Sequence, residues 1–236
     1  ALQNLQITSK EMLSTQNRIS TGLRVATAED NAAYWSIAPT MRSDNKALST
    51  VQDALGLGKA TINVAYTAMN SSIDVTSEIK AKLVAAREPG VDRSKIQTEV
   101  KELQNQLKSI ADSATFSGQN WLSVDSSASG YNATKTIVSS FTRSSDGSVS
   151  VGTISIDTSV TKLYDSSTAA NGILDASRDS TGAVATTGTA LSSMDISALT
   201  DSTTDLTTLD GYIKAADAAI KEMTASATSR ARTAAA

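Results

Sequence analysis

The sequence predicts a mainly α protein: a long antiparallel, coiled-coil-like helical rod domain that carries a Ser/Thr-rich outer insert of β or mixed α/β structure. Three observations lead to this fold class. Apolar residues recur every seven positions over most of residues 1–122 and again near the C-terminus, which is the period of helices that wrap around one another. Only 4% of the residues are aromatic, which is low for the core of a compact sandwich. Between the helical segments, short alternating runs lie among Ser and Thr residues.

The first predicted helix covers residues 1–23. One of its seven-residue rows is apolar and consists of Leu5, Met12 and Ile19. The other row is half polar and consists of Leu2, Ser9, Gln16 and Leu23. Because this seam is thin, we expect the helix to be marginal alone and to need a partner helix or chain. Gly22 can adopt a positive φ after it, and Asp30 or Asn31 can cap the next helix.

The second predicted helix covers residues 31–88 and carries the strongest pattern in the chain. Its main row consists of Tyr34, Met41, Leu48, Leu55, Ile62, Met69, Thr76 and Leu83. Gly56 and Gly58 each cost about 1 kcal/mol relative to Ala, which a long packed seam can absorb. Pro89 and Gly90 then favour a turn.

The rest of the chain divides into a third helix, an insert and a fourth helix. A regular apolar stripe runs from Ile96 to Ala114, and Asp92 or Ser94 can begin the helix, so we expect a third helix antiparallel to the second. Asp146-Gly147 is a hairpin-turn signal within the insert. Seven-residue rows return at Leu206. The predicted domain organisation is therefore a helical rod segment at 1–122, a variable outer insert at 123–205, and a helix at 206–236 that closes the rod.

Composition excludes several classes of protein. The formal net charge is −3 with a pI near 5.0, which argues against a nucleic-acid-binding protein. The chain has no Cys and no His, so it lacks thiolate ligands and the commonest general base and metal ligand. No apolar run approaches the length of a membrane span, and we identify no secretory signal peptide.

Two groups of residues have some features of chemical sites. Residues 56–61 contain Gly-Lys, but Asp53 and Ala60 occupy positions where a phosphate-binding loop needs Gly and a hydroxyl. Asp201, Asp205 and Asp210 are better explained as carboxylates near a helix N-terminus than as a catalytic or metal cluster. We therefore expect no enzymatic activity, no cofactor and no metal site.

Specific residues at the first connector carry a family resemblance. The string from Arg18 to Val25, RISTGLRV, followed by AEDNAA at residues 28–33, resembles the corresponding segment of bacterial flagellin. The resemblance extends through Leu122, where residues 116–118 resemble the Phe-Asn-Gly that ends the family's third long helix. It resumes weakly from about Leu206. Because the family carries further residues at both ends, the chain resembles a trimmed form, which we expect not to polymerise as it stands.

The resemblance implies a function and a set of partners. Flagellin is a structural subunit that polymerises into the extracellular flagellar filament for motility, with its variable insert facing outward. The implied partners are other flagellin subunits, an export chaperone and the filament cap, with no nucleic acid and no membrane. The implied route is a dedicated export channel with an uncleaved N-terminal signal. The expected subunit-interface residues are Leu5, Met12, Ile19, Gly22, Leu23, Arg24 and Asp30.

One departure from the family concerns animal Toll-like receptors. Many flagellins bear a Leu-Gln-Arg-Val-Arg-Glu-Leu segment on the second long helix, which these receptors grip through Arg and Glu. Aligned back from Leu83, this chain has Ile79 in place of the first Arg and Lys82 in place of Glu. Since the loss of an Arg and a reversed charge weaken such contacts, we expect weak or no receptor recognition.

An alternative function is a flagellin-like cell-surface adhesin or polysaccharide-binding receptor that uses the insert as its binding face. Carbohydrate sites tend to use aromatic platforms, and the insert offers Tyr131, Phe141 and Tyr164. Glycan binding by the 123–208 segment would separate this alternative from the filament subunit. An enzyme is the third possibility, and no constellation of residues supports it.

Overall fold

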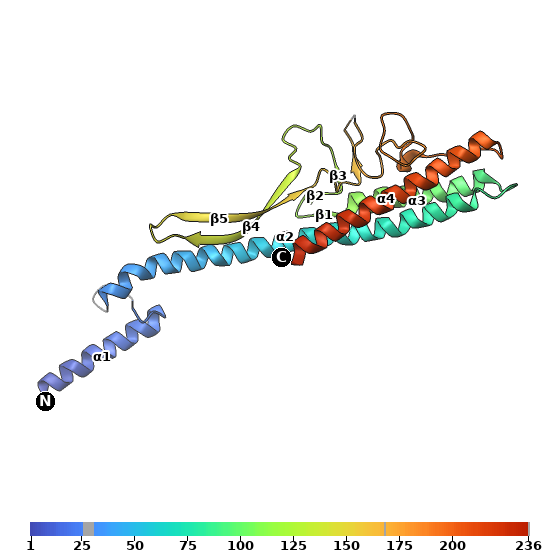
Figure 1. Ribbon diagram of the computed structural model, residues 1–236. Coiled ribbons are helices and arrows are strands. Elements are labelled where there is room, and N and C mark those ends of the chain that lie inside the picture. The colour runs from blue at the N-terminus through green and yellow to red at the C-terminus, as the bar shows by residue number, and fades with distance from the viewer. Residues whose placement is uncertain (26–30, 168, 236) are drawn as a thin grey trace. The chain divides into compact units, whose positions relative to one another are not determined.

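The computed structural model describes residues 1–25, 31–167 and 169–235, with side chains as far as residue 233 (Figure 1). Contacts divide the chain into two compact units. The first unit comprises Ala1–Asp53 and Val138–Gly152, and the second unit comprises Ala54–Ile137 and Thr153–Ala236. Long helices and a smaller strand-containing part agree with the predicted mainly α fold class.

Helix α1 spans Leu2–Thr21, close to the predicted range, and none of its residues is buried. It ends as the sequence predicts. Gly22 adopts the left-handed conformation with φ 67°, and its N–H donates to the Arg18 carbonyl at 2.9 Å. A Cβ is disfavoured at this φ, so glycine suits the position.

Helix α2 spans Ala32–Ala85 and contains the predicted seven-residue row. Asn31 caps its start, with Oδ1 accepting from the Tyr34 N–H at 3.1 Å. Pro39 lies inside the helix. Because proline has no backbone N–H, the hydrogen-bond ladder lacks one rung there.

Helix α3 spans Arg93–Ser113 and begins at the predicted Asp92 cap, whose side chain accepts from the N–H groups of Ser94 and Lys95. Arg93, the first residue of α3, links two neighbouring segments of the second unit by hydrogen bonds. Its Nε donates to the Ala86 carbonyl at 2.8 Å and its Nη2 to Asp201 at 2.6 Å. These bonds join the turn after α2 to the segment that precedes α4.

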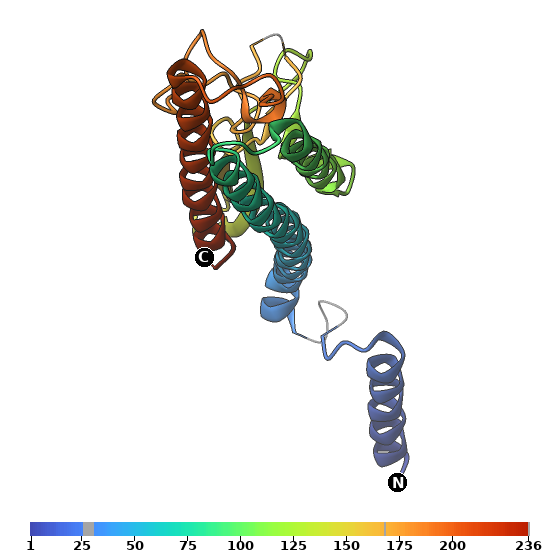
Figure 2. The same cartoon turned by 90° about the vertical axis from the view of Figure 1, so that its right-hand side faces the viewer.

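Helix α4 spans Thr203–Ala235, so it begins three residues before the predicted Leu206 and continues through the last residues described. It runs antiparallel to α2, since Lys80 near the end of α2 pairs with Asp217 at 2.7 Å and Arg87, in the turn just after α2, pairs with the earlier Asp210 at 3.0 Å. In the second unit, α3, α4 and the later part of α2 lie side by side (Figures 1 and 2).

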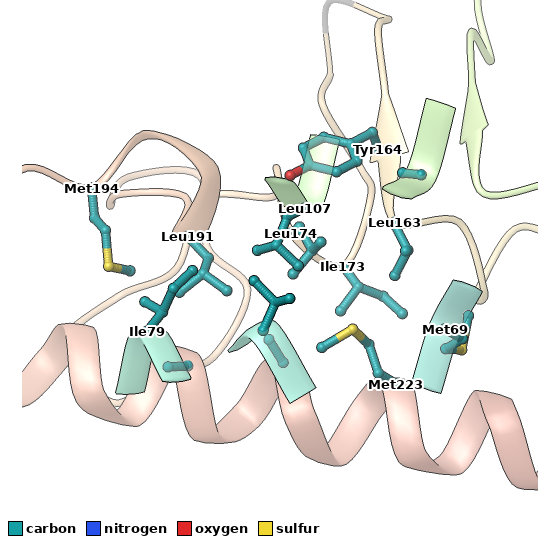
Figure 3. Packing of buried hydrophobic residues seen from close by; sticks show 14 of the residues in the cluster. Met69, Ile79, Leu107, Leu163, Tyr164, Ile173, Leu174, Leu191, Met194 and Met223 are labelled. Atoms are coloured by element: carbon teal, nitrogen blue, oxygen red, sulfur yellow. The ribbon is translucent and has the colours of Figure 1, made fainter. Parts of the chain in front are cut away.

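The main hydrophobic core lies in the second unit, where α2, α3 and α4 meet the loops that precede α4 (Figure 3). The helices contribute Met69, Ile79, Leu83, Leu107 and Met223 among others. The loops contribute Leu163, Ile173, Leu174, Leu191, Met194 and Ile196. One core therefore extends across the predicted boundary between the insert and the fourth helix.

Within the described residues, the strands form three small sheets. Strand β4 (Thr134–Arg143) pairs with β5 (Val149–Asp157) in a two-stranded sheet, and Gly147 at the turn has φ 85°, as the Asp-Gly signal predicts. Strands β1 (Thr115–Phe116) and β2 (Gln119–Asn120) pair antiparallel. Strands β3 (Ser123–Val124) and β6 (Tyr164–Asp165) pair parallel. A 3₁₀ helix, η1, spans Leu191–Ser193.

Two buried charges hold the loops before α4. Arg178 donates from both terminal nitrogens to Glu222 of α4, at 3.0 and 2.7 Å. Asp165 accepts from Lys162 Nζ at 2.5 Å and from the N–H and Oγ of Ser126 at 2.9 and 2.6 Å. The loops before α4 contain few regular backbone hydrogen bonds. These side-chain hydrogen bonds therefore stabilise the loops, as strand pairing would in a sheet.

Candidate assembly surface

The main row of α2 changes from exposed to buried along a single helix. Its first members, Tyr34, Met41 and Leu48, are 45% to 63% exposed. Its later members, Ile62, Met69, Thr76 and Leu83, are at most 3% exposed. The seven-residue repeat is the same in both halves, so the first half presents a seam of the kind that the second half buries.

Helix α1 also carries an exposed apolar row. Its predicted row, Leu5, Met12 and Ile19, is 57% to 78% exposed. A helix of 20 residues is marginal in water without packing, because nucleation is unfavourable and each added hydrogen bond contributes little. Six apolar side chains that lie in water on two helices therefore mark a surface suited to further helices. We call these six residues the assembly surface: Leu5, Met12, Ile19, Tyr34, Met41 and Leu48.

The other predicted interface residues fall at the end of α1. Gly22 caps the helix, Leu23 is half-buried and its N–H donates to Thr21 Oγ1 at 3.3 Å, and Arg24 is exposed. Asp30 lies outside the described residues. The structure therefore places Gly22, Leu23 and Arg24 in one short segment that follows the exposed row of α1.

Sequence reasoning missed further exposed apolar residues near the predicted rows. They are Ile7 and Leu13 on α1 and Trp35 on α2. They fall between the two heptad rows that were followed, so they widen the apolar face beyond a narrow seam. A count of all apolar residues on each helix, without regard to row, would have found them.

The three receptor-motif positions lie in the second unit. Ile79 and Leu83 are fully buried in the core, and Lys82 forms an ion pair with Glu99 of α3 at 2.5 Å. The hydrogen bond that Lys82 donates to the Glu99 carboxylate is the main cause that raises the pKa of Lys82. Side chains at 79 and 83 are therefore occupied by intramolecular packing.

The candidate chemical groups do not form a site. Residues 56–61 lie within α2, as the helical interpretation predicts. Asp201 bonds to Arg93, Asp205 to Thr200, and Asp210 to Arg87. Within residues 1–25, 31–167 and 169–235, no group of three or more carboxylates is placed to hold a metal ion.

In the part of the chain that the structure describes, no helix combines the length and the apolar character needed to cross a bilayer.

Within the first unit, an ion pair joins the hairpin tip to α2. Arg143 donates to Asp44 from Nε at 3.0 Å and from Nη2 at 2.7 Å. The hydrogen bond from Arg143 holds the pKa of Asp44 below its usual value. The pair lies beside Met41 in sequence, so it anchors the hairpin near the exposed half of α2.

Comparison with known proteins identifies consistent relatives. Residues 1–127 match the family described as bacterial flagellin N-terminal helical region. The chain is 59% identical over 174 residues to Flagellin C of Rhizobium meliloti (strain 1021), an alignment that covers 74% of this chain and 54% of that protein. It is 55% identical over 175 residues to Flagellin A of Rhizobium meliloti, covering 74% of this chain and 44% of the relative.

A relative from another organism gives the same result. The chain is 50% identical over 123 residues to the Flagellin of Brucella melitensis biotype 1, covering 52% of this chain and 44% of that protein. The chain thus spans about half the length of the curated relatives it matches.

Proposed function

Because the chain belongs to the bacterial flagellin family, we propose that it is a structural subunit that polymerises into the extracellular filament of the bacterial flagellum. The observation that carries this proposal is the row of α2 that is exposed at Tyr34 and buried at Leu83. Other copies of the chain cover the exposed half in the filament. The surface that they bury supplies the free energy that a lone subunit lacks.

The mechanism is mechanical and needs no chemistry at the subunit. Each apolar side chain that becomes fully covered contributes roughly 1.5–3 kcal/mol, and much of this is offset by the entropy lost on ordering the chain. Helix α1 has no buried residue in the free subunit, so it gains most from neighbours. Gly22, Leu23 and Arg24 follow α1 directly, and together with Asp30 they are the further residues that we expect to contact neighbouring subunits.

The remaining partners follow from the same proposal. A flagellar export chaperone and the filament cap handle the subunit before and during assembly, and export uses an N-terminal signal that is not cleaved. The insert at 123–205 faces outward between the rod segments at 1–122 and 206–236. The subunit is not an enzyme. The adhesin or polysaccharide receptor is not favoured, since the named relatives are flagellins.

Recognition by Toll-like receptors is weak or absent under this proposal. The burial of Ile79 and the pairing of Lys82 with Glu99 support it, because neither side chain offers the Arg and Glu contacts of the motif. A receptor reporter assay with the purified protein measures this directly. A full response would contradict the proposal.

The assembly surface is tested with a matched pair of variants in the full-length gene product. Ile19→Asp places a charge on the surface at a side chain that is 78% exposed, and Val160→Asp places one elsewhere at a side chain that is 69% exposed. Neither change disturbs the folded subunit, because neither side chain is buried. Only Ile19→Asp prevents filament formation, because a buried unpaired charge is costly.

Electron microscopy scores the filaments, and circular dichroism confirms that both variants fold. Normal filaments from Ile19→Asp would contradict the proposed function. Loss of filaments in both variants would show that any surface charge is disruptive and that the assembly surface is wrongly placed.

A further inference from the structure

The five methionines divide into two classes by exposure. Met12 and Met41 are 57% and 63% exposed, whereas Met69, Met194 and Met223 are at most 1% exposed. Met41 and Met69 belong to the same row of the same helix, α2. Both exposed methionines are the middle members of exposed apolar rows, between Leu5 and Ile19 and between Tyr34 and Leu48.

The thioether of methionine is the reactive group at these positions. Hydrogen peroxide transfers one oxygen atom to the sulfur: the O–O bond breaks, an S–O bond forms, the sulfur loses two electrons, and water leaves. The product is a sulfoxide, which is polar and accepts hydrogen bonds. Access to the sulfur governs the reaction, so Met12 and Met41 are the susceptible residues.

We propose that Met12 and Met41 are oxidation sites through which hydrogen peroxide or a related two-electron oxidant blocks assembly of the free subunit. The proposal rests on the proposed function. A sulfoxide loses hydrogen bonds with water when it is covered, and the apolar neighbours Ile19 and Leu48 offer none in return. The effect is confined to subunits that are not yet assembled, because neighbouring copies cover both sulfurs in the filament.

The first experiment measures which methionines react. The native full-length gene product is treated with hydrogen peroxide for increasing times, digested, and analysed by mass spectrometry for the addition of one oxygen. Met12 and Met41 gain oxygen first, and Met69 is the matched control on the same helix row. In guanidinium chloride all five react alike. Equal rates for Met41 and Met69 in the native protein would overturn the proposal.

The second experiment measures assembly. Oxidised subunits need about a tenfold higher concentration, or more, to form filaments, because two apolar contacts are weakened. The double variant Met12→Leu, Met41→Leu keeps apolar side chains of similar size and assembles before and after treatment. Methionine sulfoxide reductases restore assembly of the oxidised natural chain.

The outcomes separate the two proposals. If untreated subunits form no filaments, the proposed function fails and the oxidation proposal fails with it. If untreated and oxidised subunits assemble at the same concentration, the oxidation proposal alone fails. If the double variant loses assembly on oxidation as the natural chain does, other residues are responsible and Met12 and Met41 are excluded.

Discussion

At the scale of single residues, Asp165 shows how this fold uses a charge where strands are short. Asp165 is 1% exposed, and Lys162 beside it is 6% exposed. Burial alone would raise the pKa of Asp165, but the hydrogen bonds from Lys162, Ser126 and Ser167 outweigh it and hold the pKa well below its usual value. The charged form is therefore the one that the folded state stabilises.

This residue makes stability depend on pH. Because the pKa is depressed in the folded state, the stabilisation is complete above the unfolded pKa of about 4 and is lost as the pH falls below it. Asp165→Asn leaves the Lys162 ammonium buried without its partner and lowers the free energy of unfolding by roughly 3–5 kcal/mol at pH 7. Urea unfolding from pH 7 to pH 2 measures both the loss of stability in the variant and the pH dependence of stability.

The difference in the free energy of unfolding between the natural chain and Asp165→Asn becomes smaller below about pH 4. Asp53→Asn, at an exposed position of α2, is the control and changes stability by at most about 0.5 kcal/mol. If the free energies of unfolding of the natural chain and of Asp165→Asn differed by the same amount at every pH, the role of the Asp165 charge would be contradicted.

At the scale of the element, the two glycines of α2 meet different surroundings. A Cβ at Gly56 would have no atom within 4 Å beyond the helix itself. A Cβ at Gly58 would lie 2.6 Å from Cγ2 of Ile137, which packs with Ile62 and Trp121. The two glycines therefore have different roles. Gly56 is tolerated in the helix, whereas Gly58 is required because β4 packs closely against it.

The pair predicts opposite effects of the same substitution. Gly56→Ala raises the free energy of unfolding by about 0.5–1 kcal/mol, because alanine favours helix. Gly58→Ala gains the same propensity but displaces Ile137, and overpacking of this kind costs about 1–3 kcal/mol. Thermal or urea unfolding of the two variants beside the natural chain measures the difference. Equal stabilisation by both would show that Ile137 moves without cost.

Helices were predictable from the sequence because their signals are local. The seven-residue rows, the Asp92 cap, the turn at Pro89-Gly90 and the hairpin at Gly147 all depend on residues close in the chain. Burial along α2 was not predictable, since Tyr34 and Leu83 share one row. The difference depends on what covers each half, which is decided by segments far away in sequence.

The loops before α4 were unpredictable for the same reason. The bond from Arg178 to Glu222 joins residues 44 positions apart and has no local pattern. The apolar residues that these loops add to the core, such as Leu174 and Leu191, sit among polar residues without a period. The exposed residues between the rows of α1, such as Leu13, were missed because only two rows were followed.

At the scale of the whole molecule, the two units differ in how much they bury. In the part of the chain that the structure describes, both hydrophobic clusters consist of residues from the second unit. The first unit contains α1 and the exposed half of α2. Since burial of apolar surface dominates stability, the first unit should open at a lower denaturant concentration than the second.

The chain carries one tryptophan in each unit, which makes this measurable. Trp35 is 44% exposed in the first unit, and Trp121 is 5% exposed in the second. With Trp35→Phe, the fluorescence of Trp121 shifts to longer wavelength in one cooperative step on urea unfolding. With Trp121→Phe, the remaining Trp35 shows a smaller shift at lower urea. Identical midpoints and amplitudes would contradict independent units.

Pro39 has a mechanical consequence for the start of α2. The missing N–H removes the bond that would join the turn of Trp35 to the turn after it, and the proline ring crowds the same carbonyl. The first turns of α2 are therefore held by fewer backbone hydrogen bonds than the turns beyond Pro39. Bending of α2 is therefore easier near its start than along the rest of its length, because proline is a common site of helix kinks.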